Sequence, residues 1–159
     1  MRLLTISDRA SQNLYAEDLS GKAMQEVVGA SSNDFHAAGT STVVPDNVDE
    51  IRKAIRAFVS DSNEGAPDLI LTSGGTGFAP TDVTPEAVEP LIGRRADSIV
   101  AYMQNEATKI TPMACLSRTV IGVLKDSNTM LITLPGKPKA VKENMEILLR
   151  KGVILHTIR

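Results

Sequence analysis

Short apolar runs alternate with amphipathic segments along the chain. Runs rich in Leu, Ile and Val that are bounded by polar or turn residues are typical of buried β-strands. In the first half of the chain this pattern predicts strands at residues 2–7, 41–44 and 68–72. Because helical patterns separate these strands, we expect right-handed crossovers and a parallel sheet covered on both faces.

The segments between the strands have apolar residues at helical spacing. After a polar loop at residues 8–19, the segment "SGKAMQEVVG" predicts a helix with Ser20 as its N-cap and Gly29 as its stop. In "PDNVDEIRKAIRAFV" we expect Asp46 to be the N-cap, with Asp49 at the third helical position. One stripe of this second helix is apolar: Val48, Ile51, Ile55, Phe58 and Val59.

The pattern changes in the second half of the chain. Helices are predicted at residues 84–93 and 97–108. Two apolar runs, "RTVIGVL" and "TMLITLP", are separated only by "KDSN", which predicts a hairpin and therefore one antiparallel strand. A last helix is expected to begin near Pro138 and to break at Gly152, and the pattern of the tail "VILHTIR" allows either a strand or a helix.

These elements predict a single domain of the α/β class over residues 1–159, with a mostly parallel sheet and one antiparallel strand. A chain of 159 residues that is 42% hydrophobic can bury one core of ordinary size. The net charge is -2 and no basic stripe is present, so nucleic acid is not an expected partner. In such sheets ligands bind beyond the carboxyl ends of the strands.

Composition also bears on location and redox chemistry. No apolar run approaches membrane-spanning length and the N-terminus lacks a signal-peptide core, so we expect a cytoplasmic protein with no membrane partner. The single cysteine, Cys115, excludes an intramolecular disulfide and a cysteine-based zinc site, and we expect it to be a small buried residue. A bound metal would therefore have oxygen ligands.

A glycine-rich loop, "SGGTG" at residues 73–77, directly follows the third predicted strand. Residues without a Cβ let backbone N–H groups turn toward an anion and approach it closely. The loop matches neither the P-loop pattern nor G-x-G-x-x-G. The residues alone leave two interpretations open: a tight turn without a ligand, or a phosphate-binding turn.

Two aspartates are candidates for the chemistry. Asp82 comes just before Thr84, which we expect to cap a helix with Pro85 at its first position. A carboxylate there can hold hydrated Mg²⁺ against phosphates. Asp46 follows a predicted strand, so in addition to a capping role it is expected at the same edge of the sheet. Two acids beside one phosphate pocket predict a magnesium site.

Two later segments hold further candidates. In "TPMACLSR", Ser117 and Arg118 supply a hydroxyl and a guanidinium, groups that suit oxyanions. In "LPGKPKA", Pro135 and Gly136 precede a helix N-terminus, which is a second possible anion site. Hydrolysis by a nucleophilic serine is not indicated, because the chain has no G-x-S-x-G motif.

Six segments in order, "LTISD", "EDLSG", "VVPD", "DLILTSGGTGFAPTDVTPEA", "TPMACLSR" and "LPGKP", resemble the molybdopterin adenylyltransferase family of molybdenum cofactor biosynthesis. This family includes the bacterial enzyme and the G domains of fusion proteins such as gephyrin. The resemblance covers nearly the whole chain and implies a three-layer α/β fold, a helical tail after Gly152 and a homotrimer. It also implies that other molybdenum cofactor biosynthesis proteins are partners.

The implied reaction is a nucleotidyl transfer between two substrates, ATP and molybdopterin. The terminal phosphate of molybdopterin attacks the α-phosphate of ATP, and pyrophosphate leaves. The resemblance assigns Asp46 and Asp82 to catalysis and to Mg²⁺, and Ser117 to the pterin substrate. The remaining carried-over contacts are Ser73, Gly74, Gly75, Thr76 and Gly77 to phosphate, and Pro135 and Gly136 to the nucleotide.

The sequence departs from the family pattern at three places. Thr81 stands where the family usually has Arg, Thr133 stands where Asn is common, and a Pro-Gly common near Asp97 and Ser98 is absent. We expect the first change to remove a positive charge near the phosphates and the second to remove an amide that reads the substrate. Thr81 and Thr133 raise the alternative of a molybdopterin-binding relative with weak turnover. The resemblance to the animal G domain raises a second alternative, a trimeric scaffold domain.

Overall fold

The computed structural model describes residues 1–12, 18–31, 35–61, 65–149 and 152–158. Six strands form one sheet in the order β2-β1-β3-β6-β5-β4. The strands are β1 (Arg2–Ile6), β2 (Thr42–Val44), β3 (Leu69–Ser73), β4 (Ile92–Arg95), β5 (Ile121–Leu124) and β6 (Met130–Leu134). The helices are α1 (Asp8–Ser11), α2 (Leu19–Ala30), α3 (Val48–Val59), α4 (Thr84–Val88), η1 (Glu89–Leu91), α5 (Asp97–Ile110), η2 (Pro112–Leu116), α6 (Pro138–Leu149) and α7 (Val153–Ile158).

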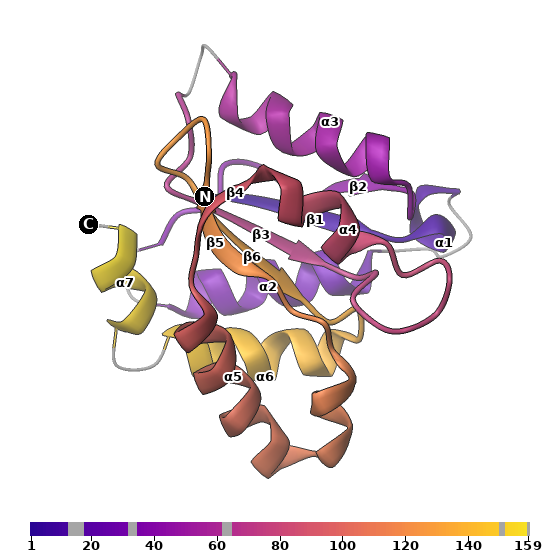
Figure 1. Ribbon diagram of the computed structural model, residues 1–159, viewed down its shortest axis with the longest axis vertical. Coiled ribbons are helices and arrows are strands. Elements are labelled where there is room, and N and C mark those ends of the chain that lie inside the picture. The colour runs from indigo at the N-terminus through magenta and orange to yellow at the C-terminus, as the bar shows by residue number, and fades with distance from the viewer. Residues whose placement is uncertain (13–17, 32–34, 62–64, 150–151, 159) are drawn as a thin grey trace.

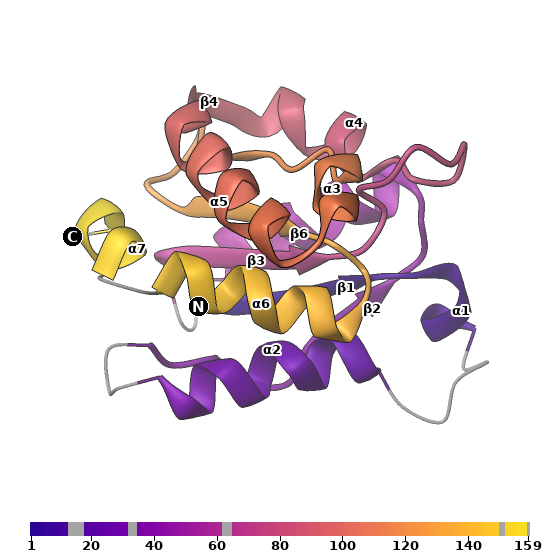
Figure 2. The same ribbon diagram turned by 90° about the horizontal axis from the view of Figure 1, so that it is seen from below.

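Helices cover both faces of the sheet, so the three-layer α/β prediction is confirmed (Figures 1 and 2). Neighbouring residues of β3 show how: Leu69 and Leu71 pack in the core under α2, α5 and α6, whereas Ile70 packs in the core under α3 and α4. Successive side chains of a strand point to opposite faces, so a strand that is covered on both faces is buried at every position. All five residues of β3 are buried for this reason.

The pairing of the strands agrees with the predicted hairpin. β1, β2, β3 and β6 pair in parallel, with Leu71 of β3 opposite Leu3 of β1 and Ile132 of β6. β5 runs antiparallel to both of its neighbours, β6 and β4. One strand is therefore reversed, as predicted. The carboxyl ends of the parallel strands all open onto the same edge of the sheet.

Two predicted helix caps are wrong by one or two residues. α2 is capped by Asp18, whose carboxylate accepts from the Gly21 N–H at 2.8 Å, and not by Ser20. It also continues past Gly29 to Ala30. α3 is capped by Asn47, because the carboxylate of Asp46, the predicted cap, accepts a hydrogen bond from another segment.

The region after the glycine-rich loop differs most from the prediction. The predicted helix at residues 84–93 is in fact α4, then η1, and then an edge strand, β4. Thr84 is the first residue of α4 and not its cap, since the N-cap position is Val83, which makes no side-chain capping bond. The polar loop at residues 8–19 begins with the short helix α1, and residues 13–17 of that loop lie outside the described residues, including Glu17 of "EDLSG".

The C-terminal elements follow the sequence prediction. α6 begins at Pro138 and buries Val141, Met145 and Leu148. Gly152 has a φ of 69°, the left-handed backbone conformation that separates two helices, and α7 follows it. The tail is thus helical, as the family resemblance implies. Within the described part of the chain, no helix combines the length and the apolar character needed to cross a membrane.

Candidate active site

A cavity of about 500 Å³ lies at the carboxyl edge of the parallel strands. It opens where β1, β2, β3 and β6 end, which is where ligands bind in sheets of this type. The cavity is lined by Thr5, Ile6, Ser7, Asp8, Arg9, Ala10, Asp18, Leu19, Ser20, Asp46, Ser73, Gly74, Gly75, Thr81, Asp82, Gly136 and Pro138. The two predicted catalytic acids, Asp46 and Asp82, are therefore brought together at one site.

Two glycines let the loop after β3 turn beside neighbouring strands. Gly74 has a φ of 108° and Gly75 a φ of 61°, conformations that L side chains rarely adopt. A Cβ on Gly74 would lie 2.1 Å from the carbonyl oxygen of Ile6, and a Cβ on Gly75 would lie 2.3 Å from Thr84 Oγ1. The Gly74 N–H donates to the Leu134 carbonyl at 3.1 Å, so it is already used within the fold.

Asp46 is held by reciprocal hydrogen bonds to Asp8. The Asp8 N–H donates to Asp46 Oδ2 at 2.9 Å, and the Asp46 N–H donates to Asp8 Oδ1 at 3.0 Å. The other oxygen, Oδ1, faces the glycine-rich loop, since a Cβ on Gly75 would be 3.0 Å from it. Burial raises the pKa of the Asp46 carboxyl; the hydrogen bond from Asp8 opposes this, and the nearby charges of Asp8 and Asp82 add to it.

Asp82 belongs to a tight turn in the loop between β3 and α4. Its Oδ2 accepts from the Ala79 N–H at 2.9 Å, and its own N–H donates to the Ala79 carbonyl at 2.9 Å. Gly77 makes room for this carboxylate, because a Cβ there would lie 2.7 Å from Asp82 Oδ2. Oδ1 of Asp82 has no hydrogen-bond partner among the described residues and is available to a ligand of the cavity.

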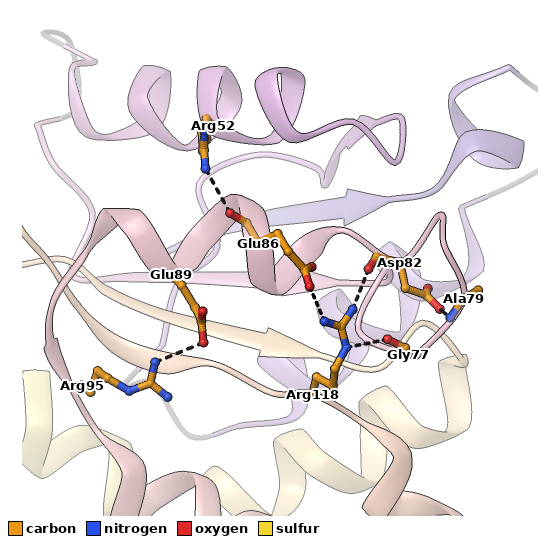
Figure 3. A network of polar contacts seen from close by, with 8 residues as sticks. All are labelled: Arg52, Gly77, Ala79, Asp82, Glu86, Glu89, Arg95 and Arg118. Atoms are coloured by element: carbon orange, nitrogen blue, oxygen red, sulfur yellow. Dashed lines mark hydrogen bonds and ion pairs between the residues drawn. The ribbon is translucent and has the colours of Figure 1, made fainter.

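Figure 3 shows the Arg118 guanidinium bonded to both sides of this turn. Arg118 is not among the residues that line the cavity. Its Nε donates to the Gly77 carbonyl at 2.7 Å and its Nη2 to the Asp82 carbonyl at 2.6 Å. Its Nη1 pairs with Glu86, and this hydrogen bond lowers the pKa of the Glu86 carboxyl. The sequence suggested Arg118 as a group for a substrate oxyanion, but the structure shows the guanidinium occupied by the protein itself.

Several hydroxyl groups form hydrogen bonds within and around the glycine-rich loop. Thr76 Oγ1 and Ser117 Oγ are 3.0 Å apart, and Ser117 Oγ and Thr119 Oγ1 are 3.2 Å apart. Ser73 Oγ donates to the Pro135 carbonyl at 3.0 Å, which joins the ends of β3 and β6. These bonds use the polar atoms of Thr76 and Ser117 within the fold.

The predicted site residues thus divide into two groups. Those that line the cavity are Asp46, Asp82, Ser73, Gly74, Gly75 and Gly136. Those that lie outside its lining are Thr76, Gly77, Ser117 and Pro135. Asp8, Asp18 and Arg9 line the cavity but were missed as site residues. The position of Asp8 directly after a buried strand could have identified it, by the reasoning that identified Asp46.

The departures from the family pattern have different consequences. Thr81 is exposed and lines the cavity, so a change there bears on the ligand. Thr133 is fully buried and its Oγ1 accepts from the Val120 N–H at 2.8 Å, so this side chain serves the sheet and cannot read a substrate in the cavity. Cys115, predicted to be buried, is exposed because it belongs to the short surface turn η2.

Acidic side chains outnumber basic ones in the lining of the cavity. Four carboxylates line it, those of Asp8, Asp18, Asp46 and Asp82. Of these, Asp18 is committed to the fold, since it caps α2 and its Oδ2 accepts from Thr5 Oγ1 at 2.7 Å. Among the described residues, Arg9 is the only cationic residue in the lining. No group of three or more His, Cys, Asp or Glu side chains suited to a metal ion occurs in the described residues.

The sequence and the fold both match known proteins. A family model described as "Probable molybdopterin binding domain" matches residues 2–154. Gephyrin of Dictyostelium discoideum is 39% identical over 155 residues, which cover 92% of this chain and 20% of gephyrin. Molybdopterin adenylyltransferase of Helicobacter pylori strain J99 is 38% identical over 147 residues, covering 91% of this chain and 78% of that protein.

A solved structure gives the same result. The molybdopterin biosynthesis enzyme MoaB of Thermus thermophilus superposes with a TM-score of 0.81 at 35% sequence identity, covering 99% of this chain and 95% of that one. The chain spans about a fifth of the length of the gephyrin relative but most of the bacterial ones.

Proposed function

The chain belongs to the family of probable molybdopterin-binding domains, and we propose that it is a molybdopterin adenylyltransferase that transfers AMP from ATP to molybdopterin. The observation that carries the proposal is the meeting of Asp46 and Asp82 beside the glycine-rich loop, in a cavity at the carboxyl edge of the sheet. Bacterial relatives with this name match more than nine tenths of the chain.

The proposed reaction is a displacement at phosphorus. An oxygen of the terminal phosphate of molybdopterin attacks the α-phosphorus of ATP, the bond from that phosphorus to the bridging oxygen of the β-phosphate breaks, and pyrophosphate leaves. Such transfers depend on positioning and charge neutralisation and need no protein nucleophile. The absence of a Ser/His motif in the sequence is consistent with this chemistry.

We propose that Asp46 and Asp82 hold Mg²⁺. The donor set fits this ion, which binds proteins through one or two carboxylates and takes its other ligands from water and substrate phosphates. Asp82 Oδ1 has no hydrogen-bond partner among the described residues, and Asp46 Oδ1 faces the same loop. When bound, Mg²⁺ would neutralise charge on the phosphates.

The charge of the cavity supports the need for a cation. Both substrates carry phosphates, while the lining has four carboxylates and one described cationic residue. Like charges repel most strongly in a partly enclosed site, where water screens them less. The nucleotide is therefore expected to bind as its magnesium complex, and Thr81 lacks the positive charge that Arg would supply.

Other expectations stay predictions from the sequence and its resemblance. They are a homotrimer, a cytoplasmic location, one domain over residues 1–159 and contacts with other molybdenum cofactor biosynthesis proteins. Ser117 stays a predicted contact to the pterin outside this cavity. Gly136 lines the cavity beside Pro138 at the start of α6, and we propose that it approaches the nucleotide.

The proposal is tested with purified protein, molybdopterin, ATP and Mg²⁺. We expect pyrophosphate release that depends on all three additions and is lost in Asp82→Ala. A matched control is Asp61→Ala, which removes a carboxylate paired with Arg2 outside the cavity and is expected to keep the activity. Release from wild type no faster than from Asp82→Ala would overturn the proposal.

The same experiment distinguishes the adenylyltransferase from the alternative function, a molybdopterin-binding relative with weak turnover. Thr81, an exposed residue of the cavity lining, is the observation that favours it. Tight binding of molybdopterin without pyrophosphate release, together with recovery of release in Thr81→Arg, would select that alternative.

A further inference from the structure

We propose that Arg118 is a positioning residue that fixes Asp82 for the reaction by closing the loop that carries it. This inference rests on the proposed function, because it assigns to Arg118 a role in the work of Asp82. Arg118 lies 36 residues from Asp82 in the sequence, in the segment between η2 and β5. It does not line the cavity, so it acts through the loop and not on a substrate.

The loop needs an external support because little of it is packed in the core. Phe78, Ala79, Pro80 and Thr81 are all exposed, and Phe78 as a whole residue is 70% exposed. Within the loop, the described hydrogen bonds are the two between Ala79 and Asp82. These bonds close a turn. At the base of the loop, the Thr84 N–H donates to the Gly75 carbonyl at 3.0 Å and Thr84 Oγ1 donates to the Gly74 carbonyl at 2.8 Å, but neither bond reaches residues 77–82.

Arg118 bonds to the loop farther out than Thr84 does, at residues 76, 77 and 82. Its backbone N–H donates to the Thr76 carbonyl at 2.8 Å, and Nε donates to the Gly77 carbonyl at 2.7 Å, where the loop begins. Nη2 donates to the Asp82 carbonyl at 2.6 Å, where the loop ends (Figure 3). One planar group thus joins Gly77 to Asp82.

A second set of contacts orients the guanidinium itself. Nη1 pairs with the carboxylate of Glu86 in α4, and the Phe78 ring lies with its centroid 5.6 Å from the guanidinium carbon. From the opposite side, Arg52 of α3 donates to the carbonyls of Glu86 and Ala87, each at 3.0 Å. These two bonds join α4 to α3 and involve neither the loop nor the Arg118 guanidinium, whereas Arg118 itself binds both the loop and α4.

The geometry requires arginine and not merely a positive charge. Three nitrogens of one rigid plane donate in three directions, whereas the ammonium group of lysine is a single point on a flexible chain. A lysine at this position could reach one of the carbonyls but could not hold Gly77, Asp82 and Glu86 together. Groups that orient a metal-binding carboxylate without touching the metal typically change activity by about 10–100-fold when removed.

The test compares Arg118→Lys with Arg52→Lys, a matched change in an arginine that also binds main-chain carbonyls but not those of the loop. Hydrogen–deuterium exchange of a peptide covering residues 77–86 reports the loop directly. For Arg118→Lys we expect faster exchange of this peptide, a kcat lowered about 10–100-fold and a smaller change in the KM for molybdopterin. For Arg52→Lys we expect near wild-type exchange at residues 77–82 and near wild-type kcat.

Wild-type exchange and kcat in Arg118→Lys would overturn the inference, and so would an equal loss of kcat in Arg52→Lys. If Arg118→Lys does not fold, Glu86→Ala removes only the anion that orients the guanidinium; intermediate exchange supports the inference and unchanged exchange overturns it. If wild type releases no pyrophosphate, the proposed function fails, while the exchange comparison still decides whether Arg118 holds the loop.

Discussion

Replacement of Gly74 by alanine tests whether the glycine-rich loop approaches β1 as closely as the structure shows. Gly74 begins the glycine-rich loop between the ends of β1 and β6. Its φ is 108°, and an added Cβ would be 2.1 Å from the main-chain oxygen of Ile6. Because this atom belongs to the backbone of β1, it cannot rotate away as a side chain could. Relief of the overlap requires a shift of the loop, which also strains the bond from Gly74 N–H to the Leu134 carbonyl.

The expected cost follows from two contributions. A non-glycine residue in a sparsely populated backbone conformation costs about 1–3 kcal/mol. Overpacking against a fixed neighbour costs about 1–3 kcal/mol more. The sum, roughly 2–6 kcal/mol, is a large part of the usual unfolding free energy of about 5–15 kcal/mol. With a urea m-value of about 2 kcal/mol/M, the unfolding midpoint should fall by about 1–3 M.

The assay is equilibrium unfolding in urea, followed by circular dichroism. The control is Gly29→Ala in α2, where a Cβ would meet nothing within 4 Å. We expect this control to raise the unfolding free energy by up to about 1 kcal/mol, because alanine favours helix more than glycine does. A midpoint for Gly74→Ala equal to that of wild type within fitting error would refute the assigned close approach of the loop to β1.

Three further predictions address single contacts. Gly77→Ala places a methyl group 2.7 Å from Asp82 Oδ2. We expect turnover to fall about 10–100-fold, while the unfolding free energy changes by about 0.5 kcal/mol or less. Turnover equal to that of wild type would contradict this prediction. Burial raises the pKa of Asp46 above its ordinary 3.8, so the folded state binds the proton of this carboxyl more tightly than the unfolded state does. The charged carboxylate therefore destabilises the folded protein fully at any pH above the raised pKa, and this destabilisation disappears as the pH falls through 3.8. Melting temperatures without Mg²⁺ should therefore be higher for Asp46→Asn at neutral pH, with the advantage lost toward pH 3.8, and the absence of any advantage at neutral pH would argue against this effect of burial. Thr133→Val leaves the buried Val120 N–H without its acceptor, and urea unfolding should show a loss of about 1–3 kcal/mol, whereas an unchanged midpoint would exclude that role.

Periodic burial explains which elements could be predicted from the sequence. α3 has Ile51 and Ile55 fully buried and Val48, Phe58 and Val59 packed around them, so its pattern is that of a single buried stripe. The run Leu69, Ile70 and Leu71 of β3 is apolar because both faces of this strand are covered. In both cases the pattern that reveals the burial is carried by residues close together in the sequence.

Contacts between distant segments explain the failures. Asp46 has the chemistry of a helix cap, but its carboxylate accepts from Asp8, 38 residues away, and Asn47 takes the cap. The predicted helix at residues 84–93 includes the first two residues of β4. Only Ile92 of this strand is buried, so no apolar run marks it, and it is a strand because it pairs with β5. Arg118 binds main-chain carbonyls, which no sequence pattern displays.

The central claim is that Asp46 and Asp82 together serve adenylyl transfer, and label transfer from ATP labelled at the α-phosphate tests it most directly. With wild-type protein, molybdopterin and Mg²⁺, the account predicts that the label moves to the molybdopterin product while unlabelled pyrophosphate is released. Asp46→Asn and Asp82→Asn should each lower the transfer rate by about 100-fold or more. Transfer at the wild-type rate in either variant, or release of the label as free AMP from wild type, would contradict the account.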